Sequence, residues 1–203
     1  MYLIVTSFSN VIVSHERLFY KKKCHIVLPS RLDEEWLKNY KETQLDKARF
    51  LYVGRNSPEK GINNFLHIFN NLKFDAEFTV VSEKKKLDIN TPKIKFIGYG
   101  LDASSLIKVY DNSNIIILPS FTESYGQVID EALSRKRPVI LFKEIQYIVG
   151  NRIGVFISER NVNSLTKTVE YILKNYLNIQ ESMLKNKLPT RNEFILKIND
   201  ILK

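Results

Sequence analysis

The stretch Asn114-Ile-Ile-Ile-Leu118 is followed by a polar loop, a helical pattern at roughly 126–135, and then Pro138-Val-Ile-Leu-Phe142. The two strand-like runs are apolar at nearly every position, which is typical of central parallel strands that helices cover on both faces. The same alternation extends outward from residue 50. Further strands are predicted at 50–54, 77–81, 94–97 and 154–157, and helices at 102–111, 161–175 and from about 190. This alternation predicts an α/β fold with a doubly wound, Rossmann-like parallel sheet.

A helix is also predicted between the strands at 50–54 and 77–81. Its apolar stripe consists of Ile62, Phe65, Leu66, Phe69 and Leu72. Ser57 is placed as the helix cap and Pro58 in the first turn, where a missing N–H costs nothing.

The charge of the chain favours an anionic partner. It has 31 Lys plus Arg against 22 Asp plus Glu, a net charge of +9. A phosphorylated small molecule, a nucleic acid and an acidic membrane surface all remain open on charge alone. The basic clusters 21–23, 84–86 and 135–137 are interpreted as solvated turns rather than binding sites.

Composition excludes several classes of protein. Apolar residues make up 44% of the chain and charged residues 26%, so the chain is globular. The single cysteine, Cys24, cannot form an internal disulfide. Neither a membrane-spanning run nor a signal peptide is recognised, and residues 1–14 are interpreted as buried strands. The expected location is the cytoplasm.

Residues 1–49 differ from the rest of the chain. Short strands are predicted near 2–6 and 10–14, with an extended segment at 25–29 and a polar stretch from 31 to 48. This pattern indicates the end of one unit and a connector into the next, so a domain boundary is placed between residues 49 and 50.

The first segment that carries chemistry is Gly54-Arg55-Asn56-Ser57-Pro58-Glu59-Lys60-Gly61. A glycine turn that leads into a helix N-terminus is where α/β sheets hold phosphates, and Arg55 and Lys60 would add two cations there. A P-loop is excluded, because Glu59 occupies the position of its second glycine and Gly61 that of its Ser or Thr. An ordinary helix start with an exposed Arg and Lys remains the alternative.

The second segment runs from Leu118 to Ala132 and carries two carboxylates. Glu123 lies in the loop and Glu131 about two turns into the helix, so they do not share a helix face. A metal-binding pair or a hydrolase dyad is therefore disfavoured. A carboxylate accepts two hydrogen bonds side by side, which suits the paired hydroxyls of a ribose or a hexose, and Gly126 lets the backbone approach a ligand closely. Glu131 taken alone could also be a surface glutamate.

Together the two segments resemble a known family. Gly54-Arg55-x4-Lys60-Gly61 with Pro119-Ser120-x2-Glu123-x7-Glu131-Ala132 is similar to the retaining nucleotide-sugar glycosyltransferases of family four, which have the GT-B fold. The resemblance covers about residues 25–175 and includes Phe96-Ile97-Gly98.

The resemblance implies a carboxy-terminal domain that binds a nucleoside diphosphate sugar. Arg55 and Lys60 would contact the diphosphate, Glu123 the transferred sugar and Glu131 the ribose, and Tyr99 would line the base pocket. Arg55, Lys60 and Glu123 are the expected catalytic residues. The other expected donor contacts are Gly54, Gly98, Ser124, Tyr125, Gly126 and Gln127.

The resemblance also implies that no metal is needed, because fixed cations and helix N-termini would stabilise the departing diphosphate. This agrees with the lack of an Asp-x-Asp motif and with the scattered positions of His15, His25 and His67.

The chain departs from the family pattern in three places. The sequence Arg135-Lys136-Arg137 replaces a small-residue turn, and Lys143-Glu144-Ile145-Gln146 replaces a glycine-rich loop. Residues 1–49 resemble only a remnant of the amino-terminal acceptor domain plus the linker, and residues 50–203 are then the donor domain with its carboxy-terminal helices. The chain is accordingly a fragment of a longer enzyme or a short protein that works with a partner chain.

The expected function is transfer of a sugar, with retention, to a glycan or glycolipid acceptor, as in polysaccharide biosynthesis. Peripheral contact with the inner membrane face is a further expectation. A non-catalytic nucleotide-sugar-binding or partner-docking module is the alternative. Nucleic-acid binding rests on charge alone and is disfavoured, since no recognised motif accompanies it.

Overall fold

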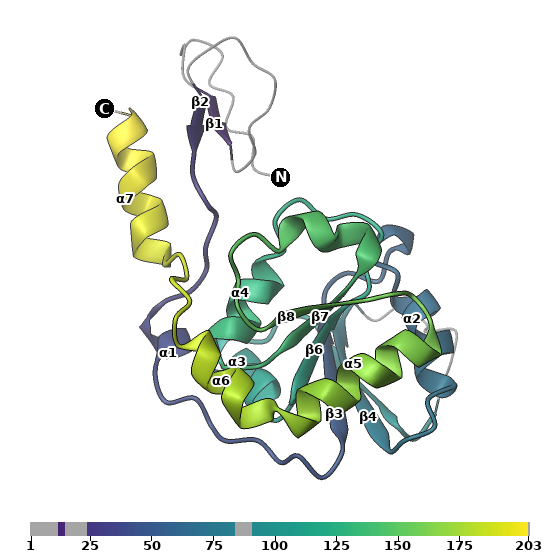
Figure 1. The fold of residues 1–203 in the computed structure, drawn as a ribbon. Helices are drawn as coiled ribbons and strands as arrows, with labels where there is room; N and C mark the ends of the chain where they lie inside the picture. The colour runs from purple at the N-terminus through teal and green to yellow at the C-terminus, as the bar shows by residue number, and fades with distance from the viewer. Residues whose placement is uncertain (1–11, 15–23, 84–90, 203) are drawn as a thin grey trace.

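Six parallel strands form the central sheet, in the order β5-β4-β3-β6-β7-β8 (Figure 1). The structure is a computed structural model, and it describes residues 12–14, 24–83 and 91–202. The strands are β3 (Ala48–Val53), β4 (Ala76–Ser82), β5 (Ile94–Gly98), β6 (Ile115–Leu118), β7 (Val139–Phe142) and β8 (Val155–Ser158). The predicted doubly wound parallel α/β fold is confirmed, and the predicted strand ends agree to within about two residues.

Helices cover both faces of this sheet. The α-helices are α1 (Glu34–Leu37), α2 (Ile62–Asn70), α3 (Ala103–Asp111), α4 (Gln127–Ser134), α5 (Val162–Lys174), α6 (Tyr176–Met183) and α7 (Arg191–Leu202). The chain moves from β3 to β4 in one direction and from β5 through β6 to β7 in the other. Right-handed crossovers therefore put α2 on one face and α3 and α4 on the opposite face. In Figure 1, α5 begins beside α2 and leads into α6, and α1 lies next to α3.

The predictions for the first helix need correction at both ends. Pro58–Lys60 form a separate 3-10 helix, η1, and α2 begins only at Ile62. Gly61 between them has φ of 66°, a left-handed conformation that ends the first turn. Ser57 does not cap α2, because its hydroxyl donates instead to Glu59, and Leu72 lies beyond the last residue of α2.

The core lies on both sides of the central strands. All residues of β6 and β7 are buried. On the face covered by α2, Phe65 packs edge-on against Phe50 and Phe78, with ring centroids 5.8 and 5.0 Å apart. This burial of apolar surface, at roughly 25 cal/mol per Å², is the main stabilising term, and it fixes the strand ends from which the loops of the site emerge.

The segment before β3 packs against the sheet domain. Leu32 and Trp36 are buried, and the Trp36 ring meets Tyr110 edge-on with centroids 5.4 Å apart. Within the predicted strand region 10–14 lies β1 (Ile12–Ser14), which pairs in parallel with β2 (Cys24–Ile26). The strand predicted near 2–6 lies outside the described residues. The division of the chain at residue 49 stays a prediction.

The interpretation of residues 135–137 as a solvated turn is wrong. Arg135 and Arg137 are only 1% and 0% exposed. Arg135 donates from Nε and Nη2 to the two carboxylate oxygens of Asp111, at 2.9 and 2.8 Å. Arg135 Nη1 and Nη2 also donate to backbone carbonyls of the segment before β3, at Glu35, Trp36, Lys38 and Asn39. Arg137 donates to the Lys41 carbonyl of that segment and to the carbonyls of Tyr110 and Asp111 at the end of α3. The clusters at 21–23 and 84–86 lie outside the described residues.

Two further elements differ from expectation. The segment that replaces the glycine-rich loop after β7 is a kinked 3-10 helix, η2 (Lys143–Ile148). The helix α6 was not predicted, because its polar and apolar residues do not form a clear stripe. After α6, the chain returns along the segment before α1, where the Ser30 hydroxyl donates to the Pro189 carbonyl and the Arg191 amide to the Leu32 carbonyl.

Candidate functional site

The site lies where the parallel strands end, because the carboxyl ends of all six strands meet at one edge of the sheet. The loop after β3 begins at Gly54, whose amide donates to the Val81 carbonyl at 3.1 Å. The Tyr52 hydroxyl donates to the Arg55 carbonyl at 2.6 Å and so fixes the turn. The Arg55 side chain is 63% exposed and contacts Glu59 at 3.4 Å. A mobile anion could therefore reach this guanidinium from solvent.

The two segments predicted from the sequence are in direct contact. The Phe121 amide donates to the Glu59 carbonyl at 2.8 Å, which ties the loop after β6 to η1. Gly61 lies against the Pro119 carbonyl so closely that a methyl group there would overlap the carbonyl oxygen. Only glycine satisfies both this approach and the left-handed backbone, so Gly61 is needed for the two loops to meet.

Lys60 and Glu123 form an ion pair across this junction. Lys60 Nζ lies 2.5 Å from Glu123 Oε1, and the side chains are 19% and 14% exposed. The Ser120 hydroxyl donates to the same carboxylate oxygen at 3.0 Å. The structure thus joins a cation from the first segment to a carboxylate from the second, and both groups are still reached by solvent.

Two residues that the sequence reading missed hold the loop after β6. The Arg160 guanidinium donates to the carbonyls of Pro119 and Ser120, at 2.8 and 3.1 Å, and lies 4.0 Å from the centre of the Phe121 ring. The Tyr147 hydroxyl accepts from the Glu123 amide at 3.1 Å and donates to the Glu123 carbonyl at 2.6 Å. The position of Arg160 just after β8, at the end of a parallel strand, could have indicated that it lies at the site. Nothing in the sequence indicated Tyr147.

Glu131 is buried between α4 and α3. The Tyr110 hydroxyl donates to its Oε2 at 2.7 Å. Burial raises the pKa of the Glu131 carboxyl, against the opposing effects of the Tyr110 hydrogen bond and the charge of Arg31. Glu131 is therefore not the surface glutamate that the sequence left open, and its carboxylate lies apart from the Lys60–Glu123 pair in a separate network.

The end of β5 supplies the remaining predicted donor contacts. Gly98 and Tyr99 are both exposed there, and burial of part of the ring raises the pKa of Tyr99 while the charges of Arg55 and Arg31 oppose that rise. The charge of Arg31 thus acts on both Tyr99 and Glu131. The sequence reading assigned no role to Arg31.

The amino-terminal end of α4 begins at Gly126, which has φ of 74°, and Gln127 is its first helical residue. The first N–H groups of such a helix have no partner within the helix and favour negative charge. Nearby, Tyr125 donates its hydroxyl to Asp130 at 2.7 Å, and burial raises the pKa of that hydroxyl. Arg152 donates to Asp130 at 2.7 Å and lies 4.4 Å from the centre of the Tyr125 ring.

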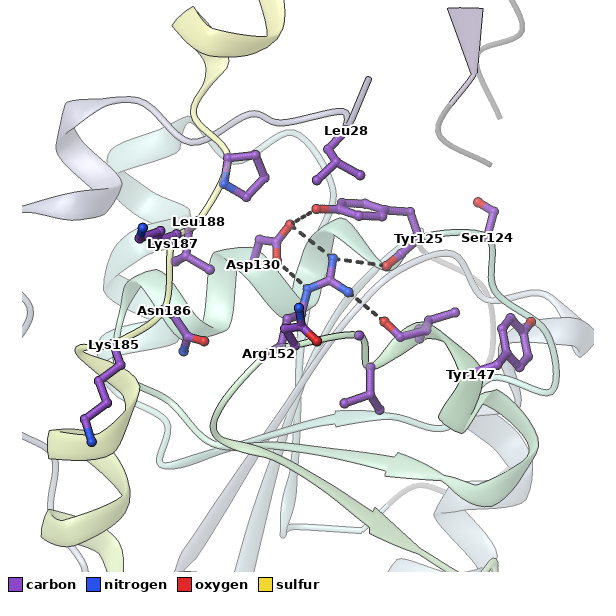
Figure 2. A pocket seen from close by; sticks show the side chains of 15 residues that line it. Leu28, Ser124, Tyr125, Asp130, Tyr147, Arg152, Lys185, Asn186, Lys187 and Leu188 are labelled. Carbon is purple, nitrogen blue, oxygen red and sulfur yellow. Dashed lines mark hydrogen bonds and ion pairs between the residues drawn. The ribbon is translucent and has the colours of Figure 1, made fainter. Parts of the chain in front are cut away.

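A pocket of about 750 Å³ opens beside this loop (Figure 2). Ser124, Tyr125 and Tyr147 line one side, and the segment from Lys185 to Pro189 lines the other. The Asp130–Arg152 pair lies between them. Arg55, Lys60 and Glu131 are not part of its lining, so the pocket adjoins the predicted diphosphate and ribose positions without containing them.

Residues 47–175 match the family model described as Glycosyl transferases group 1. A curated relative, the uncharacterized glycosyltransferase MJ1607 of Methanocaldococcus jannaschii, is 22% identical over 66% of this chain and 37% of its own length.

Solved structures show the same fold. Sucrose-phosphate synthase from Thermosynechococcus elongatus matches with a TM-score of 0.68 and 18% identity, over 89% of this chain and 52% of its own. Anabaena HepE, solved in complex with UDP-glucose, matches with a TM-score of 0.67 and 14% identity, over 88% of this chain and 57% of its own. The chain spans about half the length of these solved proteins, and less of the curated relative.

Proposed function

Because this chain belongs to the glycosyl transferases group 1 family, we propose that it binds a nucleoside diphosphate sugar as the donor domain of a retaining glycosyltransferase. The acceptor would be a glycan or glycolipid. The observation that carries the proposal is the junction of the two loops after β3 and β6, where Gly61 meets Pro119 and Lys60 meets Glu123. The complex of HepE with UDP-glucose supports a nucleotide sugar as the donor.

The chemistry follows from where the charges lie. In the reaction, the bond from the anomeric carbon to the phosphate oxygen breaks, and negative charge builds on the diphosphate. Arg55, Lys60 and the start of α4 would stabilise that charge as fixed electrostatic groups. A bound diphosphate would compete with Glu123 for Lys60, so the carboxylate of Glu123 would turn to the hydroxyls of the transferred sugar.

Glu131 would bind the ribose. Tyr110 donates to one of its carboxylate oxygens, and the other could accept a ribose hydroxyl. Tyr99, exposed at the end of β5, would contact the base. Gly54, Gly98, Ser124, Tyr125, Gly126 and Gln127 would complete the donor site, with the glycines allowing the backbone to come close.

No divalent metal would be required, because protein cations occupy the positions where the diphosphate charge develops. Among the described residues, no group of three or more His, Cys, Asp or Glu side chains could hold a metal ion. The metal-free reaction remains a proposal that chelation can test.

A second candidate is a non-catalytic nucleotide-sugar-binding or partner-docking module, which would keep the donor site and carry out no transfer. In the first candidate, the acceptor domain is supplied by a further segment or by a partner chain.

No helix within the described residues is long and apolar enough to cross a bilayer. We place the protein in the cytoplasm, with peripheral contact at the inner membrane face that its net charge of +9 would favour.

A binding screen followed by a transfer assay tests the proposal. Nucleoside diphosphates and their sugars, including UDP-glucose, are screened by thermal shift and then by calorimetry. One nucleotide should bind saturably, with micromolar to millimolar affinity, a range of about −8 to −4 kcal/mol. If none binds, the proposal fails.

The transfer assay separates the two candidates. The 203-residue chain is incubated with the donor that the screen identifies and with glycan and lipid acceptors, and product is sought by mass spectrometry. The chain alone should bind the donor yet transfer little sugar, because an open cleft exposes the reacting bond to water. Transfer that appears when the acceptor domain is added supports the first candidate. Transfer that stays absent with that domain supports the second.

A further inference from the structure

Tyr147 is an exposed aromatic residue that is held unusually firmly. Its side chain is 62% exposed, yet its hydroxyl is bonded to both the amide and the carbonyl of Glu123. The ring is therefore fixed before any ligand arrives, and a ligand that packs against it would not have to immobilise it. A fixed, solvent-facing ring at the rim of a pocket is a platform for an amphipathic ligand.

The charges on the floor of the pocket are already matched. Arg152 donates to both carboxylate oxygens of Asp130, at 2.7 and 3.3 Å, and to the Ile148 carbonyl at 2.6 Å. Tyr125 donates to the same carboxylate. Lys185 and Lys187 also line the pocket, on the side opposite Tyr147, and in Figure 2 the Lys185 side chain points away from the Asp130–Arg152 pair. An anionic ligand would therefore find the cation on the pocket floor, Arg152, neutralised, which argues for a neutral ligand.

The rim offers neutral hydrogen-bonding groups beside apolar surface. Ser124 and Asn151 line the pocket, and neither side chain forms a hydrogen bond with another described residue. Leu28 and Leu188 supply apolar surface (Figure 2). Hydroxyl and amide groups next to aromatic and aliphatic surface match a sugar ring, which has hydroxyls at its edge and C–H groups on its faces.

The pocket adjoins the loop of Glu123, and its lining includes neither Arg55 nor Glu131. A ligand in it would therefore approach the transferred sugar rather than the nucleotide. We infer that this pocket binds a neutral sugar ring of the acceptor next to the donor, with Ser124 and Tyr125 at the boundary that the two ligands share, so that the domain that holds the donor also supplies part of the acceptor site. The inference rests on the proposed function. The volume of the pocket, about 750 Å³, lies within the 300–1,000 Å³ that is usual for ligand sites.

The experiment uses the isotopically labelled full chain, saturated with the nucleotide sugar that the binding screen identifies. Methyl glycosides of glucose, galactose, mannose and N-acetylglucosamine are added up to about 50 mM, since weak sugar sites lie in the millimolar range. At least one glycoside should shift the backbone amide signals of Asn151, Arg152 and Asn186 in a saturable manner. Glucuronate and inorganic phosphate should not shift them.

Two substitutions at Tyr147 separate the ring from its hydroxyl. Tyr147→Phe keeps the ring and should keep sugar affinity within about threefold, whereas Tyr147→Ala should lower it about tenfold or more. Asn151→Ala should weaken the sugar several-fold. Asn178→Ala, an exposed asparagine on α6 outside the pocket, is the matched control and should change nothing.

Each other outcome overturns the inference. It is wrong if no glycoside shifts these signals, if the nucleotide sugar displaces the glycoside, or if glucuronate or phosphate binds better than the neutral sugars. It is also wrong if Tyr147→Ala leaves sugar affinity unchanged. Nucleotide binding is measured in the same samples. If the nucleotide binds and the sugars do not, the acceptor pocket fails while the proposed function stands.

Discussion

The clearest contrast in this molecule is between two sets of arginines that look alike in the sequence. Arg55, next to a glycine turn, has a side chain that is 63% exposed and touches a single carboxylate. Arg135 and Arg137, in a basic run that suggests a solvated turn, are buried and bonded to Asp111 and to backbone carbonyls. Exposed arginine charge is available to a ligand, whereas the buried arginine charge is used to attach the segment before β3 to the sheet domain.

The difference lies in what surrounds each guanidinium. Five N–H donors in a rigid fork can satisfy several carbonyls at once, which makes arginine suitable for holding an irregular segment. Arg135 bonds in this way to residues 35–39. The segment before β3 is thereby fixed to the sheet domain, independently of the candidate site.

The largest expected effect tests the buried set. Arg135→Met should lower the free energy of unfolding by roughly 3–5 kcal/mol, because it removes both hydrogen bonds to the buried Asp111 carboxylate and leaves only Arg137, at 3.8 Å, as its cationic neighbour. Urea denaturation measures the loss. Arg55→Met is the matched control and should change stability by less than about 0.5 kcal/mol.

A double mutant sharpens the result. Arg135→Met combined with Asp111→Asn removes both charges, so it should be less destabilised than the sum of the two single mutants. Strict additivity, or an Arg135→Met protein as stable as the wild type, would contradict the role given to the buried pair.

The next effect tests the exposed Arg55 together with Lys60, the second cation of the predicted diphosphate site. Arg55→Ala and Lys60→Ala should each weaken binding of the nucleoside diphosphate by about one to two decades, since a charge-assisted hydrogen bond contributes roughly 1.5–3 kcal/mol. Binding of the nucleoside alone should hardly change. Calorimetry with both ligands measures the difference. Lys143→Ala, an exposed lysine that also follows a strand, should leave both affinities as they are.

Much of the fold could be predicted because its signals are local. Apolar runs such as 115–118 and the helical stripe from Ile62 to Phe69 identify strands and helices without knowledge of what they touch. The meeting of the loops after β3 and β6 also follows, because parallel strands end at one edge. The burial of Arg135 does not follow, since it depends on Asp111 and on a segment about a hundred residues earlier.

The site could be predicted only in part, for the same reason. The motifs identify the site residues within the two segments. Tyr147 and Arg160 could not be identified in this way, because they contact the loop of Glu123 from elements that lie elsewhere in the sequence. The start of α2 at Ile62 was missed because the 3-10 turn depends on the contact between Gly61 and Pro119.

A smaller effect, on ligand affinity, is expected for Glu131. This residue does not fit the contrast between buried and exposed groups, because it is buried like Arg135 and yet is assigned to a ligand. Glu131→Gln should weaken ribonucleotides more than their 2′,3′-dideoxy analogues, by about tenfold, or ~1.4 kcal/mol. Glu123→Gln should instead weaken the intact nucleotide sugar and hardly affect the free diphosphate. Identical ligand profiles for the two variants, measured by calorimetry, would show that the division of roles is wrong.

The pH dependence of stability provides a further test of Glu131. Burial raises the pKa of its carboxyl above the unfolded value, so the folded chain binds more protons than the unfolded chain between the two values. The contribution of this group to stability is therefore greatest at low pH and falls as the pH rises through that window. The stability of the wild type relative to Glu131→Gln should accordingly decrease from pH 4 to pH 7 in urea denaturation. An increase over that range would mean that the carboxylate is favoured in the folded chain.

The smallest effect, none at all, is expected on removing divalent metal. If exposed protein cations neutralise the diphosphate, the affinity for the nucleoside diphosphate should be the same in EDTA and in magnesium or manganese, within about twofold, or ~0.4 kcal/mol. Calorimetry after exhaustive chelation checks this, with Lys60→Ala measured in parallel. In that variant a metal could replace the lost charge, so a gain in affinity on adding magnesium only to Lys60→Ala would support the assignment of Lys60. If the wild type instead loses its affinity for the nucleoside diphosphate in EDTA, a metal ion and not Arg55 and Lys60 neutralises the diphosphate. The two side chains would then be ordinary surface charges.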